Sequence, residues 1–416
     1  MNTLDVWPPL PLLISDRGHL TKGLDNLIAL LEHSDRVCQI NFFDVSSSQY
    51  LEKILAATQK PFPLLTDLML WSSASKMPVV DDSFLGGFAP RLRELVMDGI
   101  PFPGLAKLLL SATNLVGLHL FSIPHSGYIP PETMLATLST LTNLESLHLQ
   151  FKSPRSRPNR ASRPSPLARI VLPVLTSVKF KGVSTYLEDL VAWVDAPRLG
   201  TLFISFFNYF EFGTPNLVQF ICRTPGLKEL ERAVVSFEYG ATRVDLTSWS
   251  SGHRTLNVGI LCREVDRHIS SLEQVFISSL PSLSTLEDLY IYDGLASPLD
   301  GLDYIEIFPW LVLLRPFAAV KNLYLSEQFA PYVGFALKEL VGSKTTEVLP
   351  NLKNISLERL ELSGPAQEDI RLFVAARQVT NRPIAVTCWD RRVEDEDYDG
   401  EDYDMDYDGG VGEDDD

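Results

Sequence analysis

The stretch LVGLHL at residues 115–120 places leucines at its first, fourth and sixth positions. The same arrangement, Leu-x-x-Leu-x-hydrophobic, returns as LTDLML at 65–70, LRELVM at 92–97 and LESLHL at 144–149. Further copies begin at residues 175, 199, 227, 286, 320 and 352, and a degenerate copy covers residues 37–42. Apart from one gap between residues 227 and 286, neighbouring copies begin 23 to 34 residues apart. A unit that repeats at such a period cannot bury its own apolar face, so it must stack on its neighbours.

This pattern is typical of the strand segment of a leucine-rich repeat. Between the copies lie amphipathic stretches with apolar residues three and four apart, for example at 50–58, 131–141 and 216–224, which predict helices. Strand alternating with helix predicts parallel strands joined by right-handed crossovers. We therefore predict an open, right-handed α/β leucine-rich-repeat solenoid of roughly twelve repeats, with a concave parallel sheet and outer helices. Residues 254–260 are expected to supply the repeat missing from the gap, after the one at Leu227.

The sequence predicts three successive segments of the chain. Residues 1–36 read as one strand and one helix, at 24–31, and form an incomplete N-terminal cap. Because solenoids need polar caps, we expect exposed apolar surface around Leu10, Leu12 and Ile14. Residues 37–389 form the solenoid, which closes with a strand at 383–389, and residues 390–416 form an acidic tail. The tail has too little apolar content to fold, so we expect it to be disordered.

Composition bounds the class of protein. Apolar residues make up 45% of the 416 residues, which excludes wholesale disorder. From Asp390 onward there are fifteen Asp/Glu against two Arg, so 13 of the 17 net negative charges lie in the tail. No uninterrupted apolar run reaches the roughly 18 residues that a membrane span requires, and no secretory signal is visible. The four cysteines form no Cys-x-x-Cys pair, a usage typical of a reduced cytoplasmic or nuclear protein.

The residue between the last two apolar positions of each copy points away from the core. Along the chain this position forms one row on the concave sheet face, because neighbouring strands lie about 4.8 Å apart. A row of such mixed chemistry fits a protein or peptide partner better than a small molecule. Aromatic residues dominate interface energies, so Tyr290, Tyr324 and Phe203 are the first anchors to test. The candidate partner-binding residues are His119, His148, Lys179, Phe203, Glu231, Tyr290 and Tyr324.

The sequence contains no catalytic, cofactor or metal motif that we regard as credible. His119 and His148 occupy equivalent places on adjacent strands, but a zinc site needs a third ligand, and the flanking row positions Val96 and Lys179 offer none. Gly342-Ser343-Lys344-Thr345 lacks the glycine and the Gly-Lys order of a phosphate-binding loop. We predict a protein that is not an enzyme and that has no cofactor.

Residues 152–169 break the repeat pattern with a loop rich in Arg, Pro and Ser that contains no acid. We expect this loop to be disordered. It supports an alternative function, a nucleic-acid-associated or nuclear scaffold protein, because clustered arginines contact phosphates. The residues that would carry polyanion binding are Arg155, Arg157, Arg160 and Arg163.

Several sequence segments resemble segments of the large fungal group of F-box/leucine-rich-repeat proteins. They are LDVWPPLPL (4–12), DSFLGGFAPRL (82–92), DGIPFP (98–103), YLEDL (186–190), NVGILCREV (257–265) and FVAARQVT (373–380). The resemblance implies that the repeats hold a substrate, while an N-terminal F-box docks on the Skp-type adaptor of a ubiquitin ligase.

We expect no F-box in this chain, because only 36 residues precede Val37 and they read as a strand and a helix. A Skp-type adaptor is therefore a partner only if an N-terminal F-box is missing from this chain. The sequence predicts a non-enzymatic protein-interaction module that resembles the substrate-recognition part of an F-box ubiquitin-ligase subunit.

Overall fold

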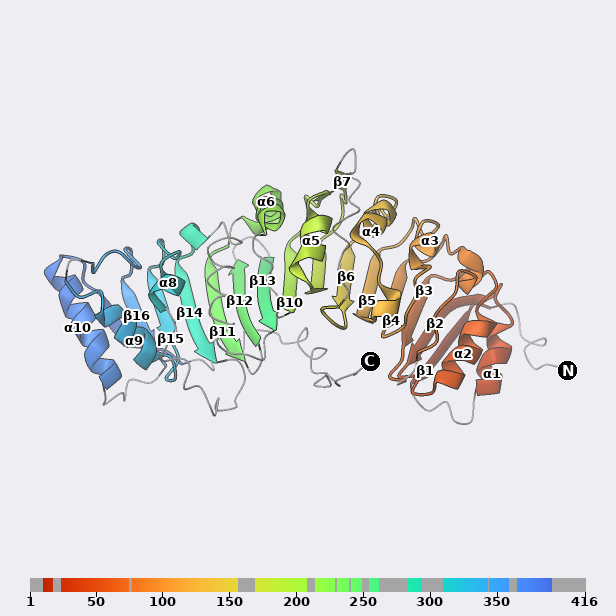
Figure 1. The fold of residues 1–416 in the computed structure, drawn as a ribbon, viewed down its shortest axis with the longest axis horizontal. Helices are drawn as coiled ribbons and strands as arrows, with labels where there is room; N and C mark the ends of the chain where they lie inside the picture. Colours follow the sequence, from red (N-terminus) through yellow and green to blue (C-terminus); the bar gives the residue numbers. More distant parts are fainter. Residues whose placement is uncertain are drawn as a thin grey trace.

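The strands follow one another along a single elongated sheet, with helices on one of its faces (Figure 1). A computed structural model describes residues 10–17, 24–74, 77–155, 169–207, 214–228, 230–238, 241–248, 254–261, 283–293, 310–342, 344–358 and 365–390. Within these residues the large sheet has 15 strands, in the order β1-β2-β3-β4-β5-β6-β8-β10-β13-β12-β11-β14-β15-β16-β17.

The elements have the following bounds. The strands of the large sheet are β1 (Leu12–Arg17), β2 (Val37–Phe43), β3 (Asp67–Trp71), β4 (Glu94–Asp98), β5 (Gly117–Ile123), β6 (Ser146–Phe151), β8 (Ser177–Gly182), β10 (Thr201–Phe207), β11 (Arg232–Glu238), β12 (Ala241–Ser248), β13 (Arg254–Leu261), β14 (Asp288–Asp293), β15 (Asn322–Leu325), β16 (Asn354–Leu357) and β17 (Ala385–Cys388). A second sheet pairs β7 (Ile170–Val171) with β9 (Val194–Asp195). The helices are α1 (Leu24–Leu31), α2 (Ser48–Ala57), α3 (Leu105–Leu109), α4 (Pro131–Leu138), α5 (Ser184–Val191), α6 (Pro215–Arg223), α8 (Trp310–Leu314), α9 (Ala330–Lys338) and α10 (Pro365–Val379), with short 3-10 turns η2 (Phe84–Gly87), η3 (His125–Gly127), η4 (Pro225–Leu227) and η5 (Leu283–Thr285).

The predicted α/β leucine-rich-repeat solenoid is confirmed. Each copy of the signature except the one at 227–232, which reaches only the first residue of β11, overlaps a strand over several residues, and most neighbouring strands pair in parallel with matching positions side by side. Leu118 of β5, for example, lies between Leu95 of β4 and Leu147 of β6. The sheet stays open, because β1 and β17 stand at its two ends.

One part of the sheet departs from the order of the sequence. The strand that follows β10 in the sequence, β11, pairs in parallel with β14 and does not contact β10 in the sheet. Strand β12 pairs antiparallel with β11 and with β13, and β13 pairs in parallel with β10. Only two residues separate β11 from β12, and a parallel pair would need a crossover of a dozen residues or more. The expected strand at 254–260 therefore exists as β13, but its predicted place after the Leu227 repeat is wrong.

The core is one continuous apolar cluster that runs from Ile14 to Ile384. Leu115, Leu118 and Leu120 show how the signature fills it, since all three side chains are buried. Burial of a leucine side chain contributes about 1.5–3 kcal/mol, and each strand sends these leucines against those of its neighbours. The stacking of repeats, and not any single repeat, therefore supplies the stability.

Asparagines tie successive turns together at the strand starts. Asn114 Nδ2 donates to the carbonyl oxygen of Pro90 at 2.8 Å, Asn143 Nδ2 donates to that of Thr113 at 3.3 Å, and Asn351 Nδ2 donates to that of Ala318 at 3.0 Å. Each asparagine directly precedes the first leucine of a signature. These bonds satisfy turn carbonyls that the sheet ladder does not reach.

The N-terminal end matches its prediction in part. Helix α1 has the predicted bounds, and β1 pairs with β2 in parallel. Leu10 is 56% exposed, as expected, and Leu12 is half-buried. The expected exposure of Ile14 is wrong: its side chain is buried because it lies beside Ile40 of β2 and joins the core.

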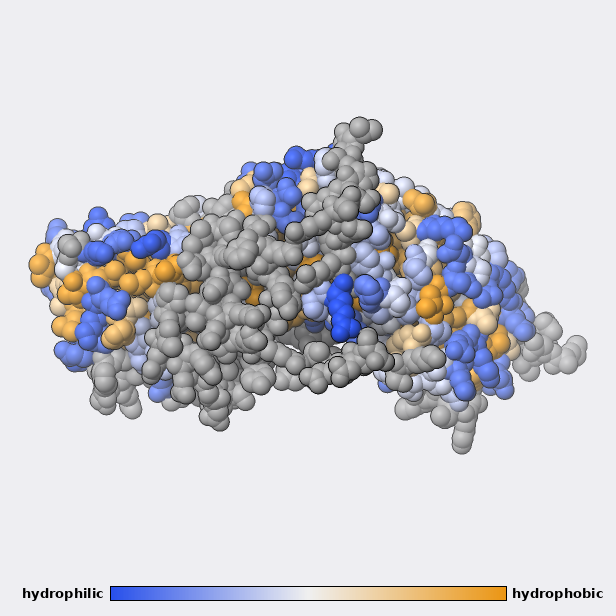
Figure 2. All heavy atoms as spheres, in the orientation of Figure 1, coloured by the Kyte–Doolittle hydropathy of each residue, from blue (hydrophilic) through white to orange (hydrophobic). Residues whose placement is uncertain are grey.

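The C-terminal end is open and partly apolar. The predicted closing strand is present as β17, and all four of its residues are exposed. Val379 of α10 is 88% exposed, and Figure 2 shows hydrophobic side chains gathered at the end that carries α9 and α10. The predicted acidic tail and most of the predicted Arg-rich loop lie outside the described residues, so the expected disorder of these segments stays a prediction.

Candidate binding surface on the concave face

The strand register defines three rows of side chains on the concave face. The middle row consists of Ser15, Asn41, Met69, Val96, His119, His148, Lys179, Phe203, Asn257, Asp245, Val234, Tyr290, Tyr324, Ser356 and Thr387. On the parallel strands, the first row lies two residues before the middle row and the third row lies two residues after it. Six of the seven predicted partner-binding residues are brought together in the middle row.

Glu231 is the exception, and its predicted place in the row is wrong. It lies one residue before β11, where its carbonyl accepts the backbone N–H of Glu287 at 3.1 Å. The buried anchors of this repeat are Leu230, Ala233 and Val235, so the signature starts three residues later than Leu227 suggests. Val234 accordingly occupies the row beside Tyr290.

Asn257 and Asp245 fill the row where β13 and β12 enter the sheet. Their side chains are buried and hydrogen-bonded to each other. Sequence periodicity could not find them, because the reversed strand order is set by the hairpin between β11 and β12. Ser146 and Phe121 are also not among the predicted residues, although the strand pattern could have found them. Each lies two positions from a histidine of the row and therefore on the same face of its strand.

Two stacked imidazoles form the centre of the row. The ring centroids of His119 and His148 lie 4.1 Å apart at an interplanar angle of 12°. Nε2 of His119 lies 3.0 Å from Oγ of Ser146, which lies 3.4 Å from Nε2 of His148. The ring of Phe121 meets both imidazoles edge-on, with centroid distances of 6.2 and 5.8 Å. This histidine cluster joins β5 to β6 on the side that faces away from the core.

The cluster is uncharged at neutral pH. Burial, the neighbouring His119 and Lys179 together lower the pKa of His148 to about 3. Burial and Lys179 also lower the pKa of His119. Desolvation disfavours the charged imidazolium, so this part of the row presents neutral, flat rings.

The cluster offers little to a metal ion or to catalysis. In the described part of the chain, no group of three or more His, Cys, Asp or Glu residues is placed to hold a metal. The Ser146–His119 contact has the length of a nucleophile–base pair. A lowered pKa makes His119 a weaker base, and such pairs also require a third group that orients the base.

A cation–aromatic contact continues the row on the next two strands. Nζ of Lys179 lies 5.4 Å from the centroid of the Phe203 ring. Both side chains are half-buried, so each keeps some surface for a partner. Such contacts contribute about 0.5–1 kcal/mol at exposed sites, which gives the ammonium group a modest preference for the position over the ring.

An aromatic cluster lies near the C-terminal end of the row, before Ser356 and Thr387. The rings of Tyr290 and Tyr324 stack with centroids 4.0 Å apart at 2°, and Trp389 meets each edge-on at 5.7 Å. The guanidinium carbon of Arg232 lies 3.8 Å from the centroid of Tyr290. Trp389 Nε1 donates to the carbonyl oxygen of Leu325 at 3.2 Å. Tyr290 is only 5% exposed, whereas Tyr324 is half-buried, so Tyr324 offers the larger surface to a partner.

Most of the arginines predicted to bind polyanions lie outside the described residues. Arg155 is exposed at the end of the segment that follows β6, whereas Arg157, Arg160 and Arg163 lie outside the described residues. Their role stays a prediction.

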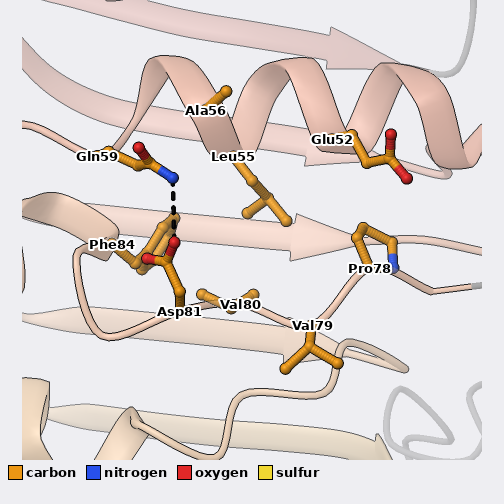
Figure 3. A pocket seen from close by; sticks show the side chains of 9 residues that line it. All are labelled: Glu52, Leu55, Ala56, Gln59, Pro78, Val79, Val80, Asp81 and Phe84. Carbon is orange, nitrogen blue, oxygen red and sulfur yellow. Dashed lines mark hydrogen bonds between the residues drawn. The ribbon is translucent and has the colours of Figure 1, made fainter.

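Two hollows occur away from the rows. The first, shown in Figure 3, holds about 150 Å³ between α2 and residues 78–84, where Gln59 Nε2 donates to Asp81 Oδ2 at 3.1 Å. Hydrogen bonds from Ser83 lower the pKa of Asp81, so the carboxylate stays charged. The second is a shallow groove of about 490 Å³ at the strand starts, lined by Thr66, Arg91, Arg93, Asn114, Val116, Asn143, Glu145 and Val174. None of the residues lining either hollow belongs to the middle row.

No protein family model matches the sequence, and no curated protein matches it. Among solved structures, the leucine-rich repeat-containing protein LegL7 from Legionella pneumophila is similar, with 13% identity over 87% of this chain and 97% of that chain. Its TM-score is 0.33. The fold is a leucine-rich-repeat solenoid. The pairing of the strands establishes this, without support from so distant a likeness.

Two further observations concern the setting of the surface. Among the described residues, no helix has the length and apolar character needed to cross a membrane. Cys38, Cys222 and Cys388 are free thiols.

Proposed function

We propose that the protein is a non-enzymatic recognition module that holds a segment of a partner protein along the middle row. The observation that carries the proposal is the continuity of that row over fifteen strands. Its residues from Asn41 to Phe203 are half-buried and keep surface for a partner, whereas Asn257, Asp245 and Val234 are buried. At about 4.8 Å per strand, fourteen spacings span roughly 67 Å. Pockets for small molecules enclose about 300–1,000 Å³ and are far more compact.

The chemistry of the row supports a protein partner. Neutral stacked imidazoles and a lysine over a phenylalanine occupy four successive strands, and a tyrosine stack follows three strands further along the row. Protein interfaces are enriched in aromatic residues, which bury large areas with few rotatable bonds. We infer that His119, His148, Lys179, Phe203 and Tyr324 contact the partner.

Peptide selection tests this function while the partner itself is still unidentified. The full chain is used to select binders from a phage-displayed library of random 12-residue peptides, and their affinities are measured by fluorescence anisotropy. Val96→Arg places a bulky cation in the middle row, and the matched control Val79→Arg makes the same change at an exposed site outside the rows. We expect at least a tenfold loss of affinity for Val96→Arg and no change for Val79→Arg. Equal effects of the two variants would overturn the proposal.

The sequence resemblance favours a more specific role, that of a ubiquitin-ligase substrate receptor in the cytoplasm or nucleus. The phrases at 82–92, 186–190 and 257–265 support it. Copurification of the full chain with a Skp-type adaptor would support this role, and a chain that retains no adaptor would leave only the general recognition function.

The alternative of a nucleic-acid-associated protein rests on the Arg-rich segment 152–169. Binding through phosphate contacts falls steeply with salt. If this function holds, polynucleotide binding at low salt is lost when Arg155, Arg157, Arg160 and Arg163 are all replaced by Ala.

A further inference from the structure

From β2 to β10 the charges of the concave face are segregated along the solenoid, whereas β11, β12 and β14 together carry both signs. Asp67 and Glu94 lie side by side in the first row on β3 and β4, and Asp98 lies in the third row on β4. Lys179 and Lys181 lie on β8, in the middle and third rows. Among the described side chains in the rows, β2, β3 and β4 contribute no Lys or Arg, and β6, β8 and β10 contribute no Asp or Glu.

The acidic side is held in place by its neighbours. Oδ2 of Asp67 accepts hydrogen bonds from Gln39 Nε2 at 3.0 Å and from Thr66 Oγ1 at 2.6 Å. The Glu94 carboxylate extends along the first row into the space beside Gly117, where a Cβ atom would stand 1.9 Å from Oε2. The missing side chain of Gly117 therefore makes room for the carboxylate on the concave face.

Two carboxylates in neighbouring positions repel each other. Burial raises the pKa of Glu94 first, and the charge of Asp67 raises it further; Arg93 offsets only part of this, and the pKa stays raised. Both carboxyl groups are half-buried. A cation from a partner would offset this repulsion, because an opposite charge within about 4–6 Å favours the charged carboxylate.

The strip between the acidic and basic sides is neutral. It consists of Val96, His119 and His148 in the middle row, with Phe121 beside them. The stacked imidazoles carry no charge at pH 7, as their lowered pKa values require. An apolar side chain can therefore lie over this strip without meeting a charge.

We propose that the concave face selects an extended protein segment that is cationic over β3 and β4, apolar over β5 and β6, and anionic over β8. This inference rests on the proposed function, and it adds the chemistry and the direction of the bound segment. Three to four strand spacings separate the acidic from the basic side, roughly 14–19 Å. At about 3.3 Å per residue, an extended segment spans this distance when its charges lie roughly four to six residues apart.

Complementary charges set orientation and exclude wrong partners more than they add affinity. A segment in the reverse direction would bring its anionic end to Asp67 and Glu94 and its cationic end to Lys179 and Lys181. Like charges then meet at both ends. The face should therefore discriminate between a peptide and the same peptide with its charges exchanged.

The test uses the full chain and the random 12-residue library. We expect selected peptides to carry Lys or Arg in one half and Asp or Glu in the other, four to six residues apart. Exchange of the two charged groups in a selected peptide should lower its affinity at least tenfold, and the difference should shrink as salt screens the charges.

Charge variants of the protein locate the effect. Asp67→Lys with Glu94→Lys should remove the basic half from the selected peptides and leave the acidic half. Lys179→Glu with Lys181→Glu should replace the acidic half by a basic one. Glu52→Lys on the exposed surface of α2 is the matched control and should change neither half. If the double lysine variant fails to fold, as judged by circular dichroism, Asp67→Asn with Glu94→Gln removes the same charges with less change in shape.

The recognition function and the charge polarity of the bound segment are refuted by different results. Peptides that bind through the middle row, as judged by Val96→Arg, but carry no charge polarity would overturn this inference and leave the recognition function standing. A selection that returns no peptide sensitive to Val96→Arg would overturn both.

Discussion

Replacement of Leu118 by Ala tests directly whether stacking of repeats stabilises the fold. The Leu118 side chain is fully buried, and its register neighbours Leu95 and Leu147 belong to the two adjacent strands. Removal of three carbon atoms forfeits about 2.4 kcal/mol of transfer free energy, at about 0.8 kcal/mol per buried carbon. The flanking leucines are held by their own strands, so the cavity closes only in part, and the cost rises to about 3–4 kcal/mol.

The matched control is Leu110→Ala. Leu110 follows α3 and is 51% exposed, so its truncation leaves no enclosed cavity and should cost about 1 kcal/mol or less. Both variants are unfolded in urea at pH 7 and followed by far-ultraviolet circular dichroism. Native-state hydrogen exchange should place the loss in β4, β5 and β6, because each repeat contacts only its neighbours. Equal destabilisation by the two variants, or a loss spread evenly to β15, would refute the reasoning.

Two further predictions concern single side chains. Because the pKa of His148 in the folded chain is about 3, the unfolded chain binds more protons below pH 6.5, and the free energy of unfolding should fall by up to about 1.4 kcal/mol per pH unit from pH 6.5 towards pH 3. His148→Gln should flatten that dependence in urea titrations at each pH, and an unchanged slope would contradict the assigned burial. Glu188 of α5 accepts the backbone N–H groups of Asn216 and Leu217 at 3.0 and 2.8 Å and so caps α6. Glu188→Ala should therefore cost about 1 kcal/mol and speed amide exchange at Leu217, whereas unaltered exchange would rule out the cap.

Much of the fold follows from local sequence patterns. The spacing of leucines predicts the parallel strands, because each buried position must recur once per strand. The helical period predicts α1, α4 and α6 to within a few residues. Row positions such as His119 and Tyr324 follow from the same pattern, since a strand alternates its two faces.

The reversal around β12 could not be predicted in this way. Strand β12 lacks the leucine signature, and its two neighbours are fixed by a two-residue connection whose consequence appears only in three dimensions. Glu231 was misplaced for a related reason: Leu227 and Leu230 imitate the signature, while Ala233 takes a position that leucine holds elsewhere. The neutrality of His148 was also out of reach, because its pKa depends on burial and on Lys179 from another strand.

The reversed strand order decides which residues stand beside one another in the middle row, because it places Asn257 and Asp245 between Phe203 and Val234. In a background with the four native cysteines replaced by Ser, Phe203→Cys is combined with Asn257→Cys or with Val234→Cys. The register places Phe203 beside Asn257, and Val234 lies three strands away, at roughly 14 Å. A disulfide requires Cα atoms about 4.4–6.8 Å apart, so mild oxidation should link the first pair and not the second. Rapid linkage of the Phe203–Val234 pair would show that β11 follows β10 directly, and it would contradict the account.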